Sequence, residues 1–426
     1  MPRKGVTVDS KDATKAIIGI LLDRSGNPLA FRLWDGERIG PADAPVTIAL
    51  QHPGALRALL IPPDDLTAGE AYVYDDVDIE GDIFSLLDFG FEFVEGGMSK
   101  STALSLFRLA RKLPRQSRRR NADRPKKQGR LHSIRRDRQD IRYHYDVGNA
   151  FYRQFLDPLM VYSSAAFLDP TEPLETAQRR KLDMICRKLQ LRSGQRLLDV
   201  GCGWGALVTH AVRNYGVDAV GITLSSQQAA WARELVDREG LTDRITILEC
   251  DYREIEGTYD AIASIGMFEH VGRIKMRAYF ERLRNLLAPG GVLLNHGIGT
   301  RDRGRGRGRI KPTFVSTYVF PDGELLPIEE VIGVAERSGF ELRDLESLRI
   351  SYAVTLRRWV ANLERHRAEA IAAADERIYR IWRAFMAGSA LSFEKARISV
   401  YQLVLADPRR PWIYGRAWAM AEDDEC

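Results

Sequence analysis

An apolar stretch that runs directly into a glycine-rich turn constrains the fold of this chain more than any other feature. Residues 197–205 read LLDVGCGWG, and an amphipathic stretch follows over residues 206–215. Glycine lets the backbone turn sharply and approach a ligand closely, because it has no Cβ. A helix that begins at such a turn presents unpaired N–H groups to a bound molecule. The pattern predicts a strand, a ligand-binding turn and a helix, although a tight turn without a ligand would have the same sequence.

Strand-like and helix-like stretches alternate along the chain around this turn. A helix is expected at residues 176–189, before it. The strands expected after it are residues 218–223, 245–250, 259–266, 292–298, 340–348 and 398–405. Such alternation is typical of an α/β fold in which a mostly parallel sheet carries helices on both faces. A helical insertion rich in Trp and Arg is expected at residues 352–393, between the last two strands.

The chain of 426 residues is long for a single hydrophobic core, which favours two domains joined by a linker. Residues 1–105 are predicted to form a small mixed α/β accessory domain, because they contain no cluster of His, Cys or carboxylate side chains. Its expected strands are residues 31–35, 46–50, 71–73 and 77–79, and its expected helices are residues 53–60 and 82–89. Residues 106–140 are interpreted as a basic linker, and residues 141–426 as the larger domain.

The positive charge of the chain is concentrated in one segment. The net charge is +5, but residues 108–142 contain fifteen Lys and Arg residues against three Asp residues. On composition alone this segment suits a solvated linker, an arm that binds nucleic acid, or a contact for anionic lipid headgroups. A second basic stretch, residues 301–309, alternates Arg and Gly.

Hydropathy and cysteine usage narrow the class of protein. No apolar run approaches the roughly 20 residues that a membrane-spanning helix needs. The N-terminal residues lack the apolar core and small-residue cleavage site of a secretory signal. The four cysteines are scattered without metal-ligand spacing: Cys186, Cys202, Cys250 and Cys426. This usage is typical of reduced thiols and predicts a cytoplasmic protein without a metal site.

Polar side chains fall at or just past the ends of five successive expected strands. In open parallel sheets, ligands bind outside the carboxyl ends of the strands. We therefore expect one binding site formed by Asp199, Thr223, Asp251, Glu269 and His296.

Two kinds of ligand suit a glycine loop of this type. A dinucleotide site needs the spacing G-x-G-x-x-G and an acidic residue at the end of the second strand. Here the third glycine comes one position early and the second strand ends in Thr223, so a nicotinamide cofactor fits poorly. An adenosyl sulfonium ligand fits better, since it needs close backbone, carboxylates for its ammonium or hydroxyl groups, and an acceptor such as Asp251 for its adenine amino group.

Ordered motifs then carry a resemblance to a known family. Residues 141–405 resemble the cyclopropane-fatty-acyl-phospholipid synthase family, which includes the mycolic acid cyclopropane synthases. The matching segments are residues 144–149 (HYDVGN), 162–165 (YSSA), 198–205 (LDVGCGWG), 221–223 (GIT), 227–228 (QQ), 251–253 (DYR), 267–272 (MFEHVG) and 296–299 (HGIG). The resemblance implies a Rossmann-like class I methyltransferase core with a mostly parallel seven-stranded sheet and helical lid insertions. The N-terminal unit resembles the family's accessory domain.

The resemblance implies that the enzyme uses S-adenosylmethionine to place a one-carbon unit on the cis double bond of a phospholipid acyl chain. Methyl transfer to an alkene leaves a carbocation, which the aromatic faces of Tyr145, Tyr162, Phe268 and Tyr318 suit, because they stabilise a cation without trapping it. The residues expected to bind the cofactor are Tyr162, Ser163, Asp199, Gly201, Gly203, Gly205, Thr223, Gln228, Asp251 and Tyr252.

A cyclopropane ring closes only when a base removes a proton from the new methyl group. In the family this base is a bicarbonate ion, and the matching positions are Ser164, Glu269, His296, Ile298 and Tyr352. Plainer readings stay open for three of them. Glu269 could cap a helix, His296 could be a hydrogen-bonded core histidine, and Tyr352 could serve packing alone.

Ser164 departs from the family, which has Cys at this position. A hydroxyl can still donate a hydrogen bond to bicarbonate, so a cyclopropane product is expected first. If the base were misplaced, the cation would lose a proton from the chain carbon or undergo a hydride shift, and the product would be a methylene-branched chain, a precursor of methyl-branched fatty acids such as 10-methylstearate. Relatives of the family make such products, which a reductase then converts.

The expected partners follow from the lipid substrate. The basic segments are candidates for contacting an anionic membrane surface, with the protein peripherally associated with the inner face of the membrane. The insertion at residues 352–393 could line the acyl-chain tunnel. A homodimer and a partner reductase stay open. A nucleic-acid methyltransferase is disfavoured, because the aromatic residues are not interleaved with the basic run, where stacking on bases would need them.

Overall fold

The computed structural model describes residues 8–24, 28–95, 97–115, 133, 136–137, 147–301 and 312–410. Residues 1–126, 309–321 and 375–391 group into one compact unit, the first unit. Residues 127–308, 322–374 and 392–426 group into the second unit. The predictions for residues 144–146, for Cys426, for most of the basic segment and for residues 302–309 lie outside the described residues.

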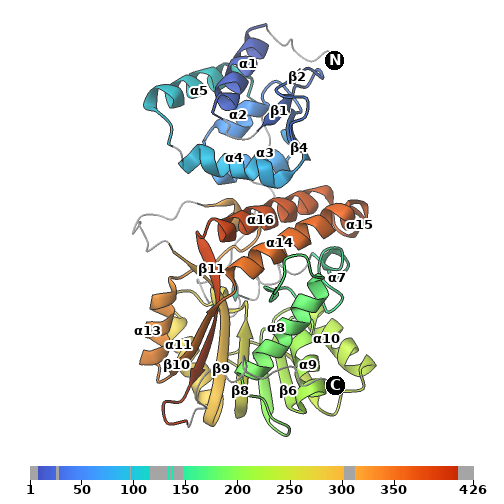
Figure 1. Cartoon of the computed structure of the whole chain (residues 1–426), viewed down its shortest axis with the longest axis vertical. Coiled ribbons are helices and arrows are strands. Elements are labelled where there is room, and N and C mark those ends of the chain that lie inside the picture. Colours follow the sequence, from blue (N-terminus) through green and yellow to red (C-terminus); the bar gives the residue numbers. More distant parts are fainter. Residues whose placement is uncertain are drawn as a thin grey trace. The chain divides into compact units, whose positions relative to one another are not determined.

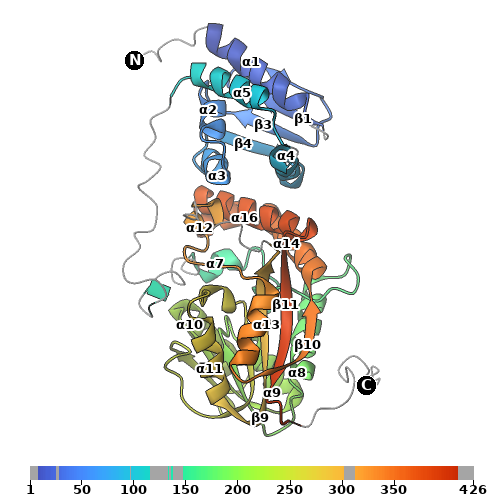
Figure 2. The ribbon, with the colours of Figure 1, turned by 90° about the vertical axis from the view of Figure 1, so that its left-hand side faces the viewer.

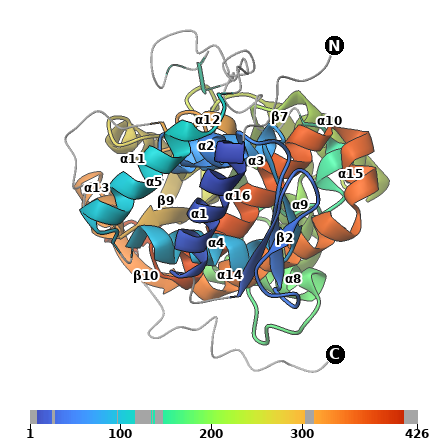
Figure 3. The ribbon, with the colours of Figure 1, turned by 90° about the horizontal axis from the view of Figure 1, so that it is seen from above.

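The first unit is built on a four-stranded sheet in the order β2-β1-β3-β4. β1 pairs in parallel with β3, and the other two pairings are antiparallel. Helices α1 and α5 lie side by side in this unit (Figures 2 and 3). The elements are α1 (Val8–Leu22), β1 (Leu29–Arg32), β2 (Arg38–Ile39), β3 (Val46–Leu50), α2 (Ala55–Leu60), α3 (Asp65–Val73), β4 (Val77–Gly81), α4 (Ile83–Glu95) and α5 (Lys100–Lys112).

Two local expectations for the first unit differ from the structure. Residues 71–73 were expected to be a strand, and they form the last turn of α3 instead. The side chain of Asp64 accepts a hydrogen bond from the N–H of Thr67 at 2.8 Å, and this cap starts a helix that continues through the apolar run. In addition, α5 extends to Lys112 with Leu106 and Ala110 buried, so the core of the unit reaches beyond residue 105.

Two segments from later in the chain belong to the first unit. α12 (Phe314–Tyr318) packs against α3, where the hydroxyl of Tyr318 donates a hydrogen bond to Glu70 Oε1 at 2.9 Å. α16 (Glu376–Glu394) contributes Arg383, whose Nη1 donates to the hydroxyl of Tyr72 at 3.1 Å. The first unit is therefore assembled from three separate stretches of sequence.

The second unit contains a seven-stranded sheet in the order β10-β11-β9-β8-β5-β6-β7. The pairings from β9 to β7 are parallel, whereas β11 runs antiparallel to both β9 and β10. The predicted mostly parallel seven-stranded sheet is confirmed. Its strands are β5 (Arg196–Val200), β6 (Asp218–Thr223), β7 (Ile245–Glu249), β8 (Tyr259–Ile265), β9 (Leu287–Thr300), β10 (Glu341–Ser347) and β11 (Ile398–Ala406).

Helices cover both faces of this sheet, as Figure 1 shows. One face packs against α8 (Leu174–Lys188), α9 (Ala206–Tyr215) and α10 (Ser226–Arg238). The other face packs against α11 (Met276–Leu286) and α13 (Ile328–Arg337). Because neighbouring residues of a strand point to opposite faces, Leu197 lies in the first core and Leu198 in the second. The remaining elements are α7 (Asn149–Tyr152), the 3₁₀ turn η1 (Phe268–His270), α14 (Arg349–Arg365) and α15 (Arg367–Ala373).

The sheet edge places the polar residues that the sequence singled out. Thr223 ends β6, Asp251 follows β7, and Glu269 follows β8. His296 lies inside β9, because the antiparallel partner β11 extends the pairing of β9 to Thr300. Among the described residues, no helix is both long and apolar enough to cross a membrane.

Candidate active site

The glycine turn after β5 forms one wall of a pocket in the second unit. Gly201 and Gly203 have φ values of +85° and +54°, which side chains with a Cβ rarely adopt. The N–H groups of Gly201 and Cys202 both donate to the carbonyl of Ile222 at 2.9 Å, which ties the turn to β6. A Cβ at Gly201 would lie 3.3 Å from Cβ of Met267, so the turn is closely packed against the residue before η1.

Nine of the ten residues expected to bind the cofactor line this pocket. They are Tyr162, Ser163, Asp199, Gly201, Gly203, Thr223, Gln228, Asp251 and Tyr252. Gly205 is absent from the lining. It has a φ of +89° at the start of α9, and a Cβ there would lie 3.1 Å from Cβ of Ala232 in α10. The structure therefore gives Gly205 a packing role between two helices.

Asp199 presents a buried carboxylate to the pocket. It is 2% exposed, and its Oδ1 has no hydrogen-bond partner among the residues that the structure describes. Burial raises the pKa of Asp199 to about 7, and the Lys181 ammonium opposes this rise. A buried acceptor without a partner is costly unless a ligand donor reaches it. This atom is suited to an ammonium or hydroxyl group.

Lys181 is a pocket residue that the sequence analysis missed. It is 1% exposed, lines the pocket, and its Nζ donates to Oγ of Ser163 at 2.9 Å. Burial lowers the pKa of Lys181 to about 8, and the carboxylates of Asp157 and Asp199 oppose this fall. A signal was present in the sequence, because Gln178 and Lys181 interrupt the apolar stripe of α8 that continues through Leu182 and Ile185.

Thr223 and Gln228 are joined at the end of β6. Thr223 Oγ1 donates to Gln228 Oε1 at 2.8 Å, and Ser225 Oγ accepts the N–H of Gln228 at 3.3 Å. Ser225 is therefore the N-cap of α10. The Gln228 side chain points back to the strand end rather than completing a reciprocal cap.

Asp251 is held by Arg253 at the end of β7. Arg253 donates to Oδ1 of Asp251 at 2.6 Å and to Oδ2 at 2.7 Å, and it also donates to Asp137 at 2.8 Å. Asp137 and Arg253 both line the pocket. The guanidinium therefore fixes the orientation of the Asp251 carboxylate at the pocket wall.

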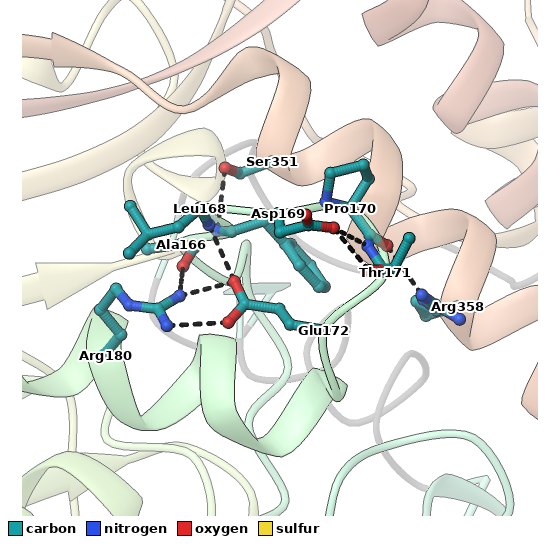
Figure 4. A network of polar contacts seen from close by, with 10 residues as sticks. Ala166, Leu168, Asp169, Pro170, Thr171, Glu172, Arg180, Ser351 and Arg358 are labelled. Carbon is teal, nitrogen blue, oxygen red and sulfur yellow. Dashed lines mark hydrogen bonds and ion pairs between the residues drawn. The ribbon is translucent and has the colours of Figure 1, made fainter.

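The segment that carries Ser163 and Ser164 is anchored by α8 and α14, as Figure 4 shows for its second half. Arg180 of α8 donates to the carbonyl of Ala166 at 2.8 Å and forms a bidentate ion pair with Glu172. The N–H of Phe167 donates to Ser351 Oγ of α14 at 3.2 Å. On its first half, Gln178 Nε2 donates to the carbonyl of Ser163 at 3.0 Å.

A second set of functional groups lies at η1 and β9, outside the lining of the pocket. Glu269 Oε1 accepts the N–H of Ile298 at 2.7 Å. Its Oε2 is buried without a partner among the described residues. Burial raises the pKa of Glu269 to about 7, and the N–H of Ile298 opposes this rise.

His296 precedes Ile298 by two residues on β9, so the two side chains point to the same face of the sheet. His296 is 2% exposed, and its Nδ1 lies 3.2 Å from Nε2 of Gln402. Its Nε2 is buried and has no partner in the described part of the chain. Burial, reinforced by the charges of Lys181 and Lys188, lowers the pKa of His296 to about 3. The imidazole is therefore neutral at physiological pH.

The two remaining candidates come from other elements. Ser164 is fully buried, and its Oγ donates to the carbonyl of Ala165 at 2.9 Å. Tyr352 lies on α14 with its ring centroid 4.7 Å from that of Phe393 and 6.2 Å from that of Trp359. Trp359 in turn stacks on Tyr162 with a centroid distance of 5.2 Å. An aromatic row thus connects Tyr352 to the pocket wall.

Phe268 is placed differently from the expectation that its face would meet the reacting chain. It is 3% exposed and lies in the core formed with α11. Its ring contacts Tyr279 and Phe280 at centroid distances of 6.0 and 6.1 Å. Phe268 is therefore a core residue beside α11.

Comparison with known proteins identifies the family. The family model described as mycolic acid cyclopropane synthetase matches residues 132–403. The chain belongs to the mycolic acid cyclopropane synthase family. It is 38% identical over 385 residues to a probable fatty acid methyltransferase of Pseudomonas putida, covering 89% of this chain and 92% of that protein. It is 36% identical over 424 residues to a probable fatty acid methyltransferase of Mycobacterium tuberculosis, covering 93% and 97%.

A solved member of the mycolic acid cyclopropane synthase family has the same fold and carries a cofactor product. The structure of mycolic acid cyclopropane synthase CmaA1 complexed with SAH and CTAB has a TM-score of 0.60 and 35% identity. The match covers 63% of this chain and 98% of CmaA1. This chain is an S-adenosylmethionine-dependent C-methyltransferase, and its relatives support methyl transfer to an unsaturated lipid.

The pocket fits this cofactor. The glycine turn allows close approach of a ligand to the start of α9, and the buried Oδ1 of Asp199 lacks a donor that the cofactor ammonium can supply. Asp251 offers an acceptor just past the end of β7, two strands away from β5 in the sheet. The residues expected to bind the cofactor therefore come together in one pocket, with Gly205 as the exception, whereas Glu269 and His296, expected in the same site, lie outside its lining.

Proposed function

We propose that this enzyme transfers the methyl carbon of S-adenosylmethionine to the cis double bond of an unsaturated acyl chain of a phospholipid and closes a cyclopropane ring. The observation that carries the proposal is a pair of buried polar atoms, Glu269 Oε2 and His296 Nε2, that have no partner among the described residues. Met267 and His270, which flank Phe268 and Glu269, line the cofactor pocket. Without a ligand, each of these buried atoms would lack a hydrogen bond and would lower the stability of the fold by about 1–3 kcal/mol. A bound ligand would remove this cost.

The pocket residues are proposed to hold S-adenosylmethionine, which supplies an electrophilic methyl group. Asp199 would accept from its ammonium, and Asp251 from the adenine amino group. Ser163, oriented by Lys181, would contact the amino-acid end. These residues would fix the direction in which the methyl group points, because an alkene reacts only with a closely aligned electrophile.

A bicarbonate ion is proposed to be held by Glu269, His296, the backbone at Ile298, Ser164 and Tyr352. When bound, it supplies the base that removes a proton from the transferred methyl group. The ion has one O–H and several acceptor oxygens, which match the acceptor at Glu269 Oε2 and the open ring nitrogen at His296 Nε2. Because the pKa of His296 is lowered to about 3, its neutral imidazole is a weak base and does not compete with the anion for the proton.

The aromatic row of Tyr162, Trp359 and Tyr352 is proposed to line the path of the acyl chain. Trp359 is 1% exposed and belongs to α14, within the helical insertion expected to contact lipid. Aromatic faces would stabilise positive charge on the chain without forming a covalent bond to it.

Formation of a methylene-branched chain is the second candidate, and the hydrogen bond of Ser164 favours it. The hydroxyl donates its proton to the carbonyl of Ala165, so in this geometry Ser164 has no proton to offer an anion. With the base held loosely, a 1,2-hydride shift would move the positive charge to the carbon that carries the new methyl group, and loss of a proton from that methyl group would leave a methylene branch. A partner reductase would then be needed to give a methyl branch.

Product analysis separates the two outcomes. The enzyme is incubated with oleoyl phospholipid vesicles and methyl-labelled S-adenosylmethionine, with and without added bicarbonate, and the lipids are examined by NMR and mass spectrometry. Upfield ring-proton signals that depend on bicarbonate are the expected result. Olefinic methylene signals in their place would establish the branched product, and no label in lipid would overturn the proposal as a whole.

The enzyme is further proposed to act at an anionic membrane surface from the cytoplasm. In the first unit, α5 exposes Leu104 and Phe107, each 46% exposed, beside the cations of Arg108 and Arg111. Apolar side chains flanked by cations suit insertion among anionic headgroups. A homodimer is retained as the proposed assembly, and nucleic acid is not a proposed partner.

Vesicle sedimentation tests the membrane proposal. Binding to anionic vesicles is expected to fall as salt rises, because surface charges are screened within about 8 Å at physiological ionic strength. Phe107→Ser is expected to weaken binding at constant salt. Salt-independent binding, or equal binding to neutral vesicles, would contradict the electrostatic contribution.

A further inference from the structure

A row of polar side chains crosses three strands of the sheet on the side of α8. Glu346 of β10 is paired in register with Gln402 of β11, and Gln402 with His296 of β9. Residues paired in register point to the same face, so the three side chains are neighbours. Gln402 and His296 are fully or almost fully buried, at 0% and 2% exposure.

Lys188, in the last turn of α8, closes this row. It is completely buried and donates through Nζ to Gln402 Oε1 at 2.7 Å and to Glu346 Oε2. The ammonium has three donors and no acceptor. It therefore fixes the Gln402 amide with its oxygen toward Lys188, because the flipped amide would place N–H groups against a cation.

The fixed amide determines which nitrogen of His296 carries the proton. Gln402 Nε2 faces His296 Nδ1 at 3.2 Å, and an amide nitrogen can only donate. Nδ1 must then accept, so the neutral imidazole carries its hydrogen on Nε2. That is the buried nitrogen without a partner among the described residues.

We propose that Lys188 and Gln402 are positioning residues that hold His296 as the Nε2–H tautomer and thereby present a hydrogen-bond donor to the anionic base. The inference rests on the proposed function for the identity of the anion. The tautomer itself follows from the chain of contacts from Lys188 through Gln402 to His296. Lys188 and Gln402 need not touch the anion.

The tautomer can be read directly by NMR on the whole enzyme in bicarbonate-free buffer. The chain has seven histidines, so ¹⁵N-histidine labelling gives few signals, and His296 is assigned by the signal lost in His296→Asn. Two-bond ¹H–¹⁵N spectra distinguish the two neutral tautomers and the imidazolium. The expected result is Nε2–H in the wild type. A wild-type signal from the Nδ1–H tautomer or from imidazolium would overturn the proposal.

Gln402→Glu replaces the amide between Lys188 and His296 with a carboxylate of nearly the same size and shape. Its carboxylate would accept from Lys188 with one oxygen and from Nδ1–H of His296 with the other, so the proton should move to Nδ1. The bicarbonate concentration for half-maximal activity is expected to rise at least about tenfold, with unchanged binding of S-adenosylmethionine. Gln154→Glu, the same substitution on a half-buried residue away from this row, should change neither reading.

Lys188→Met provides a second variant if Gln402→Glu fails to fold. Without the ammonium the amide can flip, and the His296 signal should split between tautomers or change to Nδ1–H. An unchanged Nε2–H signal in this variant would overturn the role of Lys188. If the wild type shows the Nε2–H signal but its activity does not depend on bicarbonate, the positioning role of Lys188 and Gln402 is supported. The same result would contradict bicarbonate as the base.

Discussion

Glu269 and Ile298 share one short hydrogen bond that divides the Glu269 carboxylate between two roles. Oε1 accepts the backbone N–H of Ile298 at 2.7 Å, and Oε2 is buried without a partner among the described residues. The bond orients the carboxylate, because the N–H belongs to β9, which is paired on both sides within the sheet. One oxygen is therefore held by the sheet and the other is left for a ligand.

Replacement of this carboxylate should remove activity without removing cofactor binding. Glu269→Gln keeps an oxygen for Ile298 but presents an amide N–H, instead of an acceptor, at the open position. We expect methyl transfer to fall by about 100-fold or more, with calorimetric binding of S-adenosylmethionine retained. Glu281→Gln, on the exposed side of α11, is the matched control. Activity of Glu269→Gln within twofold of the control would contradict the assignment.

The same residue predicts a change of stability with pH. Burial raises the pKa of Glu269 from 4.5 to about 7, so between these values the folded chain holds a proton that the unfolded chain has lost. Stability from this group is therefore present below about pH 4.5 and declines as pH rises through 7. Thermal unfolding should show that Glu269→Gln is more stable than the wild type at pH 8, and that this advantage is smaller at pH 4. An advantage that grows toward low pH would show the opposite sign.

Lys181 is expected to tune the cofactor pocket. Lys181→Met removes the donor to Ser163 and the ammonium whose charge lowers the pKa of Asp199, so Asp199 would be protonated more easily. The affinity for S-adenosylmethionine should fall about tenfold or more at pH 7, which is about 1.4 kcal/mol. Calorimetric titration measures it, with exposed Lys100→Met as the control. Equal affinities in the two variants would assign Lys181 to packing alone.

Ser164→Cys tests whether the departure from the family pattern affects the product. The thiol is a weaker donor to the carbonyl of Ala165 than the hydroxyl, so it is more readily turned toward a bound anion. We expect the cyclopropane fraction of the methylated lipid to stay equal or rise, and the branched fraction to fall. Mass spectrometry and NMR of the same vesicles report both. A larger branched fraction would reverse the role given to this position.

The ion pair of Arg180 and Glu172 should stabilise the segment that carries Ser163 and Ser164. The Arg180 guanidinium lowers the pKa of Glu172 from 4.5 to about 2, so its contribution is present above pH 4.5 and is lost as pH falls toward 2. Glu172→Gln should cost about 1 kcal/mol or more at pH 7 and little at pH 2. Glu175→Gln, in the exposed pair with Arg179, should cost less, as judged by calorimetric unfolding.

Much of the second unit was predictable because its signals are local. The apolar stretches that define β5 to β8 are bounded by turns, and the predicted strand at residues 218–223 coincides with β6. A short apolar run such as residues 71–73 suits either a helix or a strand, and there the Asp64 cap decided for α3. The end of β9 was placed too early, because the pairing partner β11 comes about a hundred residues later in the chain.

The sequence by itself determined the family, the glycine turn and the residue types of the site, since these depend on short ordered motifs. Only the tertiary structure showed that Gly205 packs helices, that Phe268 faces the core, and that Lys181 and Lys188 are buried. Lys188, Gln402 and His296 lie far apart in the sequence, on α8, β11 and β9, so their contact cannot be predicted from the spacing of residues. Hydrogen bonding acts through distance in space, so the tautomer of His296 is decided only when those three elements pack together.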